Sequence, residues 1–200
     1  MRGLSIALLA TGLPFSMCMK PPPSSCERPE SYYYYEEQEV PLLLDSSRIA
    51  LFAPAGPGDE AADALATVGI GLNDLESHAI PGWYLAPVPA EKADPCGVEA
   101  IVAALADSAA FDFVAPVFSG PQIITQDLLV TFNDDVSSGE AQEILDLLQA
   151  GTITHSGLGI YSVRSPSRSG FAVLEAASQL NEHPQVRFAD PDRIITGGGY

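Results

Sequence analysis

The residues of this sequence that come closest to a nucleophile and its base are His155 and Ser156, which stand next to each other. A serine nucleophile needs a base within hydrogen-bond reach and a third group that orients the base. Because the surrounding residues predict a β-hairpin, adjacent side chains point to opposite faces and do not form a triad. The sequence has no Gly-Thr-Ser nucleophile motif and no Gly-Thr after His78. We therefore interpret His155 and Ser156 as turn residues and predict no catalytic residue and no enzyme.

Two pairs of carboxylates carry the residue type that binds Ca²⁺, namely Asp134 with Asp135 and Asp190 with Asp192. Neither pair has the ligand spacing of an EF-hand loop, so we interpret both as solvated turns. The three histidines are far apart in the sequence, and there is no C-x-x-C spacing. The sequence therefore predicts no metal site, and it shows no phosphate loop or other cofactor motif.

The chain contains three cysteines, Cys18, Cys26 and Cys96. In an oxidising compartment, Cys26 and Cys96 are candidates for a disulfide bond. Cys18 would then be the unpaired cysteine, and it stands where a lipoprotein signal places its lipidated residue. Met17 departs from the small residue expected there. Lipidation at Cys18 and plain cleavage of a signal therefore both remain open.

The first 18 residues have the pattern of a signal peptide. Arg2 supplies a positive start, and residues 3–15 form an apolar run that is too short to span a membrane comfortably. The alternative is a buried N-terminal helix. We favour the signal, which predicts an exported protein that is secreted, periplasmic or a cell-surface lipoprotein. A lipid at Cys18 would be its only attachment to a membrane.

Residues 19–46 lack hydrophobic periodicity and are predicted to form a linker. They contain three consecutive prolines, then Tyr32 to Tyr35 and two glutamates. The tyrosines are typical of a tether with incidental aromatic residues, although a sticky or glycan-binding patch is the alternative.

The charge of the chain excludes one class of partner. With 26 acidic and 9 basic residues, the formal net charge is −17 at pH 7. Nucleic acid is a poor partner for such a surface, because contacts with phosphates need clustered lysine and arginine. An anionic membrane surface is excluded for the same reason. The hydrophobic content of 46% is enough for one ordinary core or two small ones.

The body of the chain repeats one order of elements. Residues 47–120 and 121–200 each predict strand, helix, hairpin, helix and strand. The predicted first unit has strands over 48–53, 83–88 and 111–118 and helices over 59–68 and 98–107. The predicted second unit has a strand over 127–132, a helix over 138–150, a hairpin of 152–155 and 158–164 around Ser156-Gly157, a helix over 169–181 and a strand over 185–190.

This order is βαββαβ, so we predict an α+β fold of two tandem ferredoxin-like βαββαβ units. Each unit should be an antiparallel sheet with its helices on one face and the other face partly open. The alternative is that the two halves belong to one larger sheet.

Three short phrases resemble a known family. They are Phe113-Val114-Ala115-Pro116-Val117-Phe118, then Asp127-Leu128-Leu129-Val130-Thr131-Phe132, and Val186-Arg187-Phe188-Ala189-Asp190-Pro191. Together they resemble the N-terminal pro-region of secreted subtilisin-like serine proteases, in particular the fervidolysin-like prodomain, over about residues 48–195. The resemblance implies an intramolecular chaperone or inhibitor. Its open sheet face packs on two helices of the protease, and its C-terminal tail lies in the substrate cleft.

The end of this chain fits such a tail, which would add to a sheet edge of the protease by main-chain hydrogen bonds. The residues concerned are Ile195, Thr196, Gly197, Gly198, Gly199 and Tyr200. The glycines let the backbone approach closely, and Tyr200 suits a primary specificity pocket. Gly197 departs from the bulky apolar residue that such clefts favour three positions earlier. A flexible terminus without a role is the alternative.

The sequence thus predicts a non-catalytic, exported protein that binds a subtilisin-like serine protease as inhibitor or folding chaperone. Inhibition is assigned to the second unit and a spacer role to the first. The alternatives are an extracellular structural or adhesive module, and the remnant of a truncated protease precursor.

Overall fold

The computed structural model describes residues 31–35, 38–120 and 122–195. The strands are β1 (Ser31–Tyr35), β2 (Gln38–Leu42), β3 (Leu44–Phe52), β4 (Glu76–Ser77), β5 (Trp83–Pro87), β6 (Phe113–Phe118), β7 (Gln122–Phe132), β8 (Thr152–Gly157), β9 (Ile160–Arg164) and β10 (Val186–Ile195). The helices are α1 (Asp59–Val68), α2 (Pro95–Asp107), α3 (Ser138–Leu147) and α4 (Gly170–Asn181), with short 3-10 turns η2 (Leu72–Asp74) and η3 (Ala90–Lys92).

The strand order confirms the predicted fold class. In the first unit the spatial order is β4-β5-β3-β6, and in the second it is β8-β9-β7-β10. Numbered within each unit, both orders are 2-3-1-4 and all neighbours are antiparallel, which is the arrangement of a ferredoxin-like βαββαβ unit. The fold is therefore α+β, with two such units in tandem.

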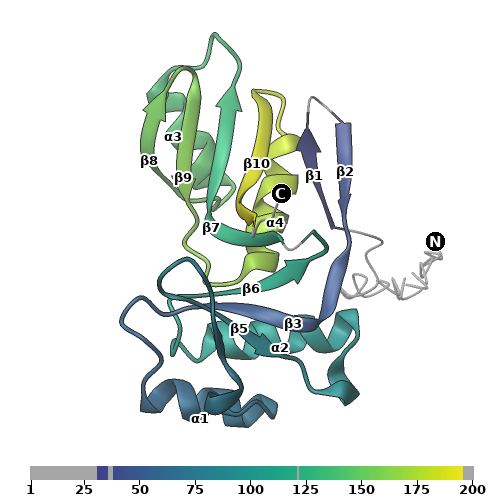
Figure 1. The fold of residues 1–200 in the computed structure, drawn as a ribbon. Helices are drawn as coiled ribbons and strands as arrows, with labels where there is room; N and C mark the ends of the chain where they lie inside the picture. Colours follow the sequence, from purple (N-terminus) through teal and green to yellow (C-terminus); the bar gives the residue numbers. More distant parts are fainter. Residues whose placement is uncertain (1–30, 36–37, 121, 196–200) are drawn as a thin grey trace, which may run out of the picture.

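The two sheets are also joined into one. β6 and β7 form a tight hairpin in which Val117 pairs with Ile123 and Phe118 with Gln122. Further along, β7 pairs with β9 on the same edge and with β10 on the other. The larger single sheet and the two units, which the sequence left as alternatives, thus both describe the molecule. Figure 1 shows the second unit above, with α3 and α4 behind its strands, and the first unit below it.

Local sequence explains where the helices begin and end. Asp94 caps α2 by accepting a hydrogen bond from the Gly97 amide at 2.9 Å, and Pro95 begins the helix where no N–H partner is needed. Ser137 and Glu140 form a reciprocal capping box at the start of α3. These bonds from Ser137 lower the pKa of the Glu140 carboxyl. α1 ends at Gly69, whose φ of 87° favours glycine.

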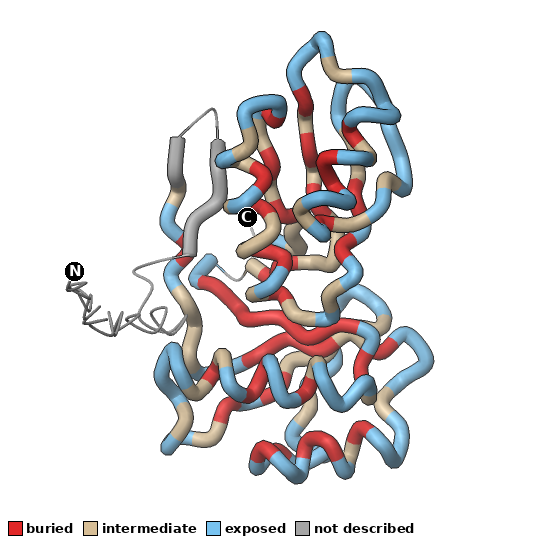
Figure 2. The backbone as a smooth tube through the Cα atoms, turned by 180° about the vertical axis from the view of Figure 1, so that it is seen from behind, coloured by how far each residue is buried: buried red, intermediate tan, exposed pale blue. Residues whose placement is uncertain are grey.

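Two buried clusters hold the described residues together. One lies between α1, α2 and the first sheet, and includes Leu51, Leu65 and Leu105. The other fills the second unit but also contains Trp83 and Phe113 of the first. Figure 2 shows that the strands at the centre of the molecule are almost continuously buried.

Within the predicted linker of residues 19–46, the described residues form β1, β2 and the start of β3 instead. β1 and β2 pair as an antiparallel hairpin from Ser31↔Leu42 to Tyr35↔Gln38, and β3 begins at Leu44. β1 contacts β10 and α4. Tyrosines and Val40 favour extended backbone, which explains a hairpin where hydrophobic periodicity gave no signal.

Three predicted boundaries move in the second unit. β7 starts at Gln122 rather than 127, because its first residues pair with β6. β10 continues to Ile195 rather than ending at 190, because β7 offers it a partner over that length. The hairpin between β8 and β9 turns at Leu158-Gly159, both with positive φ, rather than at Ser156-Gly157.

Candidate functional site

The sheet of the first unit does not have an open face. Its side chains that point away from α1 and α2 include Ala50, Trp83, Phe113 and Ala115, and each is at most 7% exposed. They belong to the same buried cluster as the core of the second unit. The expectation of an open face on this unit was wrong, because the second unit packs against it.

The second unit does have an open face. Leu128, Val130 and Phe132 of β7 face the helices and are buried. The residues that alternate with them, Leu129 and Thr131, therefore face the opposite side. Register places Ser162 of β9 and Asp190 of β10 beside Leu129, and Phe188 beside Thr131. These five residues define what we call the open face. All are partly exposed, and neither buried cluster includes them.

The open face is nearly neutral in charge within a strongly acidic chain. Asp127, which borders the open face two residues before Leu129, accepts two hydrogen bonds from Arg164 at 2.5 and 2.8 Å. The bond to Asp127 raises the pKa of the Arg164 guanidinium. Asp190 pairs with Arg193 at 3.2 Å. From Leu147 through Leu174, a stretch that includes β8 and β9, the sequence has no acidic residue.

Four of the ten carboxylates in residues 121–200 lie on the helices behind the sheet. On α3, Glu140, Glu143 and Asp146 are all on or near the surface. A partner approaching the open face therefore meets Asp127 and Asp190, each paired with an arginine, and Asp192 near Asp190. Depletion of unpaired charge is typical of the centre of a protein interface.

Asp190 differs from the other carboxylates of the face. Its side chain is 17% exposed, and its Oδ1 atom is buried without a hydrogen-bond partner. Burial outweighs the attraction of Arg193 and raises the pKa of Asp190 to about 6. Thr131 Oγ1, on the same face, is also buried without a partner.

The outer edges of this sheet are occupied by side-chain amides. Asn181 at the end of α4 donates to the Ala189 carbonyl and accepts from its N–H, both at 2.7 Å. On β8, Gln142 of α3 donates to the Gly151 carbonyl and accepts from the Ile153 N–H, both at 3.2 Å. Each side-chain amide makes the hydrogen bonds that a neighbouring strand would make, so another strand cannot be added to the edges at these points. The face, rather than either edge, is the accessible part of the sheet.

The structure separates the residues that the sequence singled out. His155 and Ser156 are successive exposed residues of β8 and pair with different residues of β9. Asp134 and Asp135 lie in the exposed turn after β7, but Asp190 and Asp192 lie within β10 rather than in a solvated turn. Among the described residues, no group of three His, Cys, Asp or Glu side chains is placed to hold a metal ion.

Part of the predicted site lies outside the described residues. Ile195 is the last residue of β10 and is 67% exposed, whereas Thr196, Gly197, Gly198, Gly199 and Tyr200 fall outside the described ranges. Cys96 at the start of α2 is disulfide-bonded. The other two cysteines of the chain, Cys18 and Cys26, both fall within residues 1–30, which are not described. No helix in the described part is long and apolar enough to cross a membrane.

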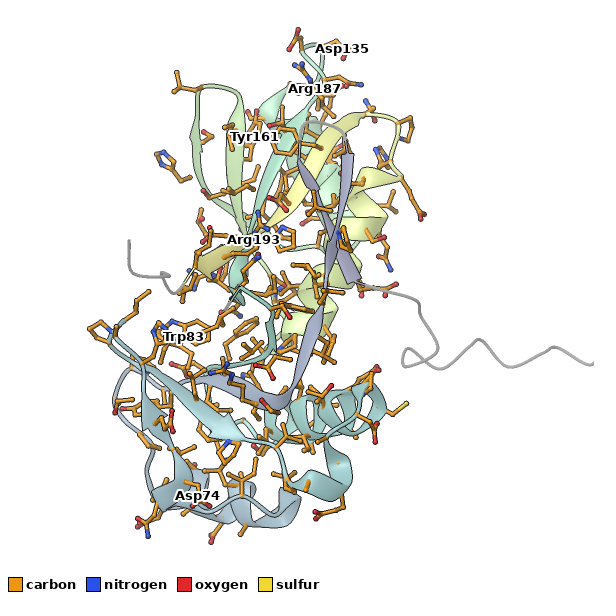
Figure 3. The ribbon with its side chains drawn as sticks, turned by 45° about the vertical axis from the view of Figure 1, so that its right-hand side comes forward. Asp74, Trp83, Asp135, Tyr161, Arg187 and Arg193 are labelled. Carbon is orange, nitrogen blue, oxygen red and sulfur yellow. The ribbon has the colours of Figure 1, made fainter. Side chains whose placement is uncertain are left out.

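Arg193 marks the junction between the units. In the view of Figure 3, Arg193 lies between Tyr161 of the second unit and Trp83 of the first. Tyr161 stacks edge-on against Phe132, with ring centroids 5.4 Å apart, and Trp83 against Phe113 at 6.3 Å. Arg193 also donates to Gln122 at the start of β7, at 3.2 Å. The end of β10, from which the predicted tail continues, is therefore attached at this junction.

Comparisons with known proteins assign no family. No family model and no curated protein matches the chain. Among solved structures, it is similar to the crystal structure of the acetolactate synthase small subunit from Thermotoga maritima, with 15% identity and a TM-score of 0.30. That match covers 76% of this chain and 98% of the other. At this TM-score the likeness carries no argument about function, and the fold assignment rests on the strand order.

Proposed function

We propose that this chain is a non-catalytic, exported protein that binds a subtilisin-like serine protease on the open face of its second unit, as inhibitor or folding chaperone. The observation that carries the proposal is the asymmetry between the two units. The first sheet is buried on both faces, whereas the second presents a partly apolar, nearly neutral face. In a chain of net charge −17, such a face is the surface best suited to a protein partner.

A second argument comes from the size of this face. Four strands spaced about 4.8 Å apart, with about five residues each at about 3.3 Å, cover roughly 300 Å². A stable interface buries about 800 Å² on each partner. The open face alone is therefore too small, and a second contact is required. Residues Ile195 to Tyr200, which end and follow β10 in the sequence, are the segment proposed to supply the second contact.

The first unit is proposed to act as a spacer and support. Burial of Trp83 and Phe113 fixes it against the second unit, so it holds that unit in place without offering a comparable face. The disulfide at Cys96 supports export, because such bonds persist in oxidising compartments. With Cys26 as its partner, Cys18 stays available for a lipid anchor, which is the proposed membrane attachment.

The experiment that tests this function is inhibition of a purified subtilisin-class protease by the purified, exported chain. A matched variant lacks residues 197–200. We expect tight, slowly reversible inhibition by the complete chain and weaker inhibition by the shortened one, because the second contact is lost. Rapid degradation of both versions would contradict the proposal and would favour a structural surface module or a precursor remnant.

A further inference from the structure

The tip of the β8–β9 hairpin holds a leucine in a strained backbone conformation. Leu158 has a φ of 54° and Gly159 a φ of 79°, and these two residues form the whole loop between the paired Gly157 and Ile160. A two-residue loop with positive φ at both positions is typical of a type I′ turn, which favours Asn-Gly. Glycine occupies the second position here, but the first position holds leucine, whose bulk makes a positive φ costly.

Packing within the chain does not offset this cost. Leu158 is 104% exposed, so its side chain buries no apolar surface. A Cβ atom added to the neighbouring Gly159 would have nothing within 4 Å, so the tip stands clear of the rest of the molecule. The turn therefore combines backbone strain with an exposed aliphatic side chain, and burial of Leu158 in a partner would compensate for both.

The tip adjoins the open face. Ile160 lies two residues before Ser162 on β9, and alternation places both side chains on the same side of the sheet. Ile160 is itself 42% exposed. Leu158, next to this end of β9, thus extends the partly apolar surface that includes Leu129. A protein seated on the open face reaches Leu158 from the same side of the molecule.

The charges near the tip disfavour a lipid surface as its partner. The hairpin has no acidic residue, since none occurs over residues 147–174, and its Arg164 is paired with Asp127. Asp134 and Asp135 lie in the exposed turn after β7, at the end of the sheet where the antiparallel β9 begins. These two carboxylates repel anionic headgroups, so an aliphatic side chain beside them suits an apolar pocket of a protein better than a membrane.

We propose that Leu158 is an anchor that inserts into an apolar pocket of the protein that docks on the open face. The open face alone covers roughly 300 Å², less than half of what a stable interface buries on each partner. The hairpin tip adjoins this face and adds apolar area to it. Full burial of a leucine side chain strengthens binding by about 10- to 150-fold. This inference rests on the proposed function and names the contact by which the protease would be held.

Leu158→Asn separates an anchor from a structural residue, because it should stabilise the fold and weaken binding. Asn-Gly is the favoured pair of this turn, so we expect the urea midpoint of the complete chain to rise by about 0.5 M as backbone strain is relieved. The inhibition constant for a subtilisin-class protease should rise by about 10- to 150-fold. Leu147→Asn is the matched control. It removes a leucine that is 75% exposed at the end of α3 and has no positive φ, so it should change neither the inhibition constant nor raise the midpoint.

The possible results separate the anchor from the proposed function. Equal inhibition by the unaltered chain and Leu158→Asn would overturn the anchor and leave the proposed function standing. A lower urea midpoint for Leu158→Asn would also overturn it, because Leu158 would then support the fold. Flotation with phosphatidylcholine vesicles tests the lipid alternative, and binding that only Leu158→Asn loses would assign the tip to a membrane instead. Absence of inhibition by the unaltered chain would overturn the proposed function, and the anchor with it.

Discussion

Because the two units share a buried cluster, a cavity in the second unit should destabilise the first. Leu180 on α4 is fully buried, and it belongs to the same cluster as Trp83 of the first unit. Leu180→Ala removes buried methyl groups and leaves a cavity, which costs about 2–5 kcal/mol. If the units unfold together, this loss appears in every probe of folding, including probes located far from α4.

The chain provides such a probe, because Trp83 is its only tryptophan. Urea unfolding followed by Trp83 fluorescence reports the first unit, and far-UV circular dichroism reports both. With a cost of about 3 kcal/mol and a urea dependence of about 2 kcal/mol per M, both midpoints should fall by about 1.5 M. The two curves should remain superimposed in the variant.

Leu65→Ala is the matched control, since Leu65 on α1 is fully buried in the cluster of the first unit alone. It should lower both midpoints in the same way. The reasoning is refuted if Leu180→Ala shifts the circular dichroism curve and leaves the Trp83 midpoint unchanged. That result would mean that the units fold separately and that the buried face of the first is not held by the second.

Further predictions concern single side chains. Asn181→Ala should lower the free energy of unfolding by about 2 kcal/mol, because two backbone groups lose their hydrogen-bond partner. Gln142→Ala should lower it by less, because the hydrogen bonds of Gln142 are longer. Urea unfolding measures both changes, and equal losses for the two variants would contradict this comparison. At pH 7.5, Asp190→Asn should be more stable than the unaltered chain by about 1–2 kcal/mol after allowance for solvent screening. This difference in stability should disappear toward pH 4, because the carboxyl of Asp190 in the unaltered chain is then protonated. Peptide mapping without reduction should link Cys96 to Cys26; a link to Cys18 would exclude lipidation there.

Hydrophobic patterning was enough to predict both units. The helices and strands of the repeat follow from apolar periodicity, glycines and caps such as Ser137. The boundaries that moved depend on tertiary partners. β10 continues to Ile195 only because β7 is long enough to pair with it, and β7 starts at Gln122 only because β6 lies beside it. Neither length is visible in the local sequence.

The candidate site could be predicted only in part. Alternation along β7 could have distinguished Leu129 and Thr131 from the buried Leu128 and Val130. The ion pair of Asp127 with Arg164 joins residues of different strands, so no local pattern indicates it. The burial of the first sheet face also required the structure, because a single βαββαβ unit leaves that face open.

The most direct test of the proposed function compares the inhibition constants of two variants that carry the same leucine-to-arginine substitution at different positions. Leu129→Arg places a charge on the open face, whereas Leu147→Arg makes the same change on α3, where Leu147 is already 75% exposed. Against a subtilisin-class protease, we predict that Leu129→Arg raises the inhibition constant by about 30- to 160-fold, as expected for a central contact worth about 2–3 kcal/mol, and that Leu147→Arg leaves it nearly unchanged. Equal inhibition constants for the two variants would contradict docking on the open face.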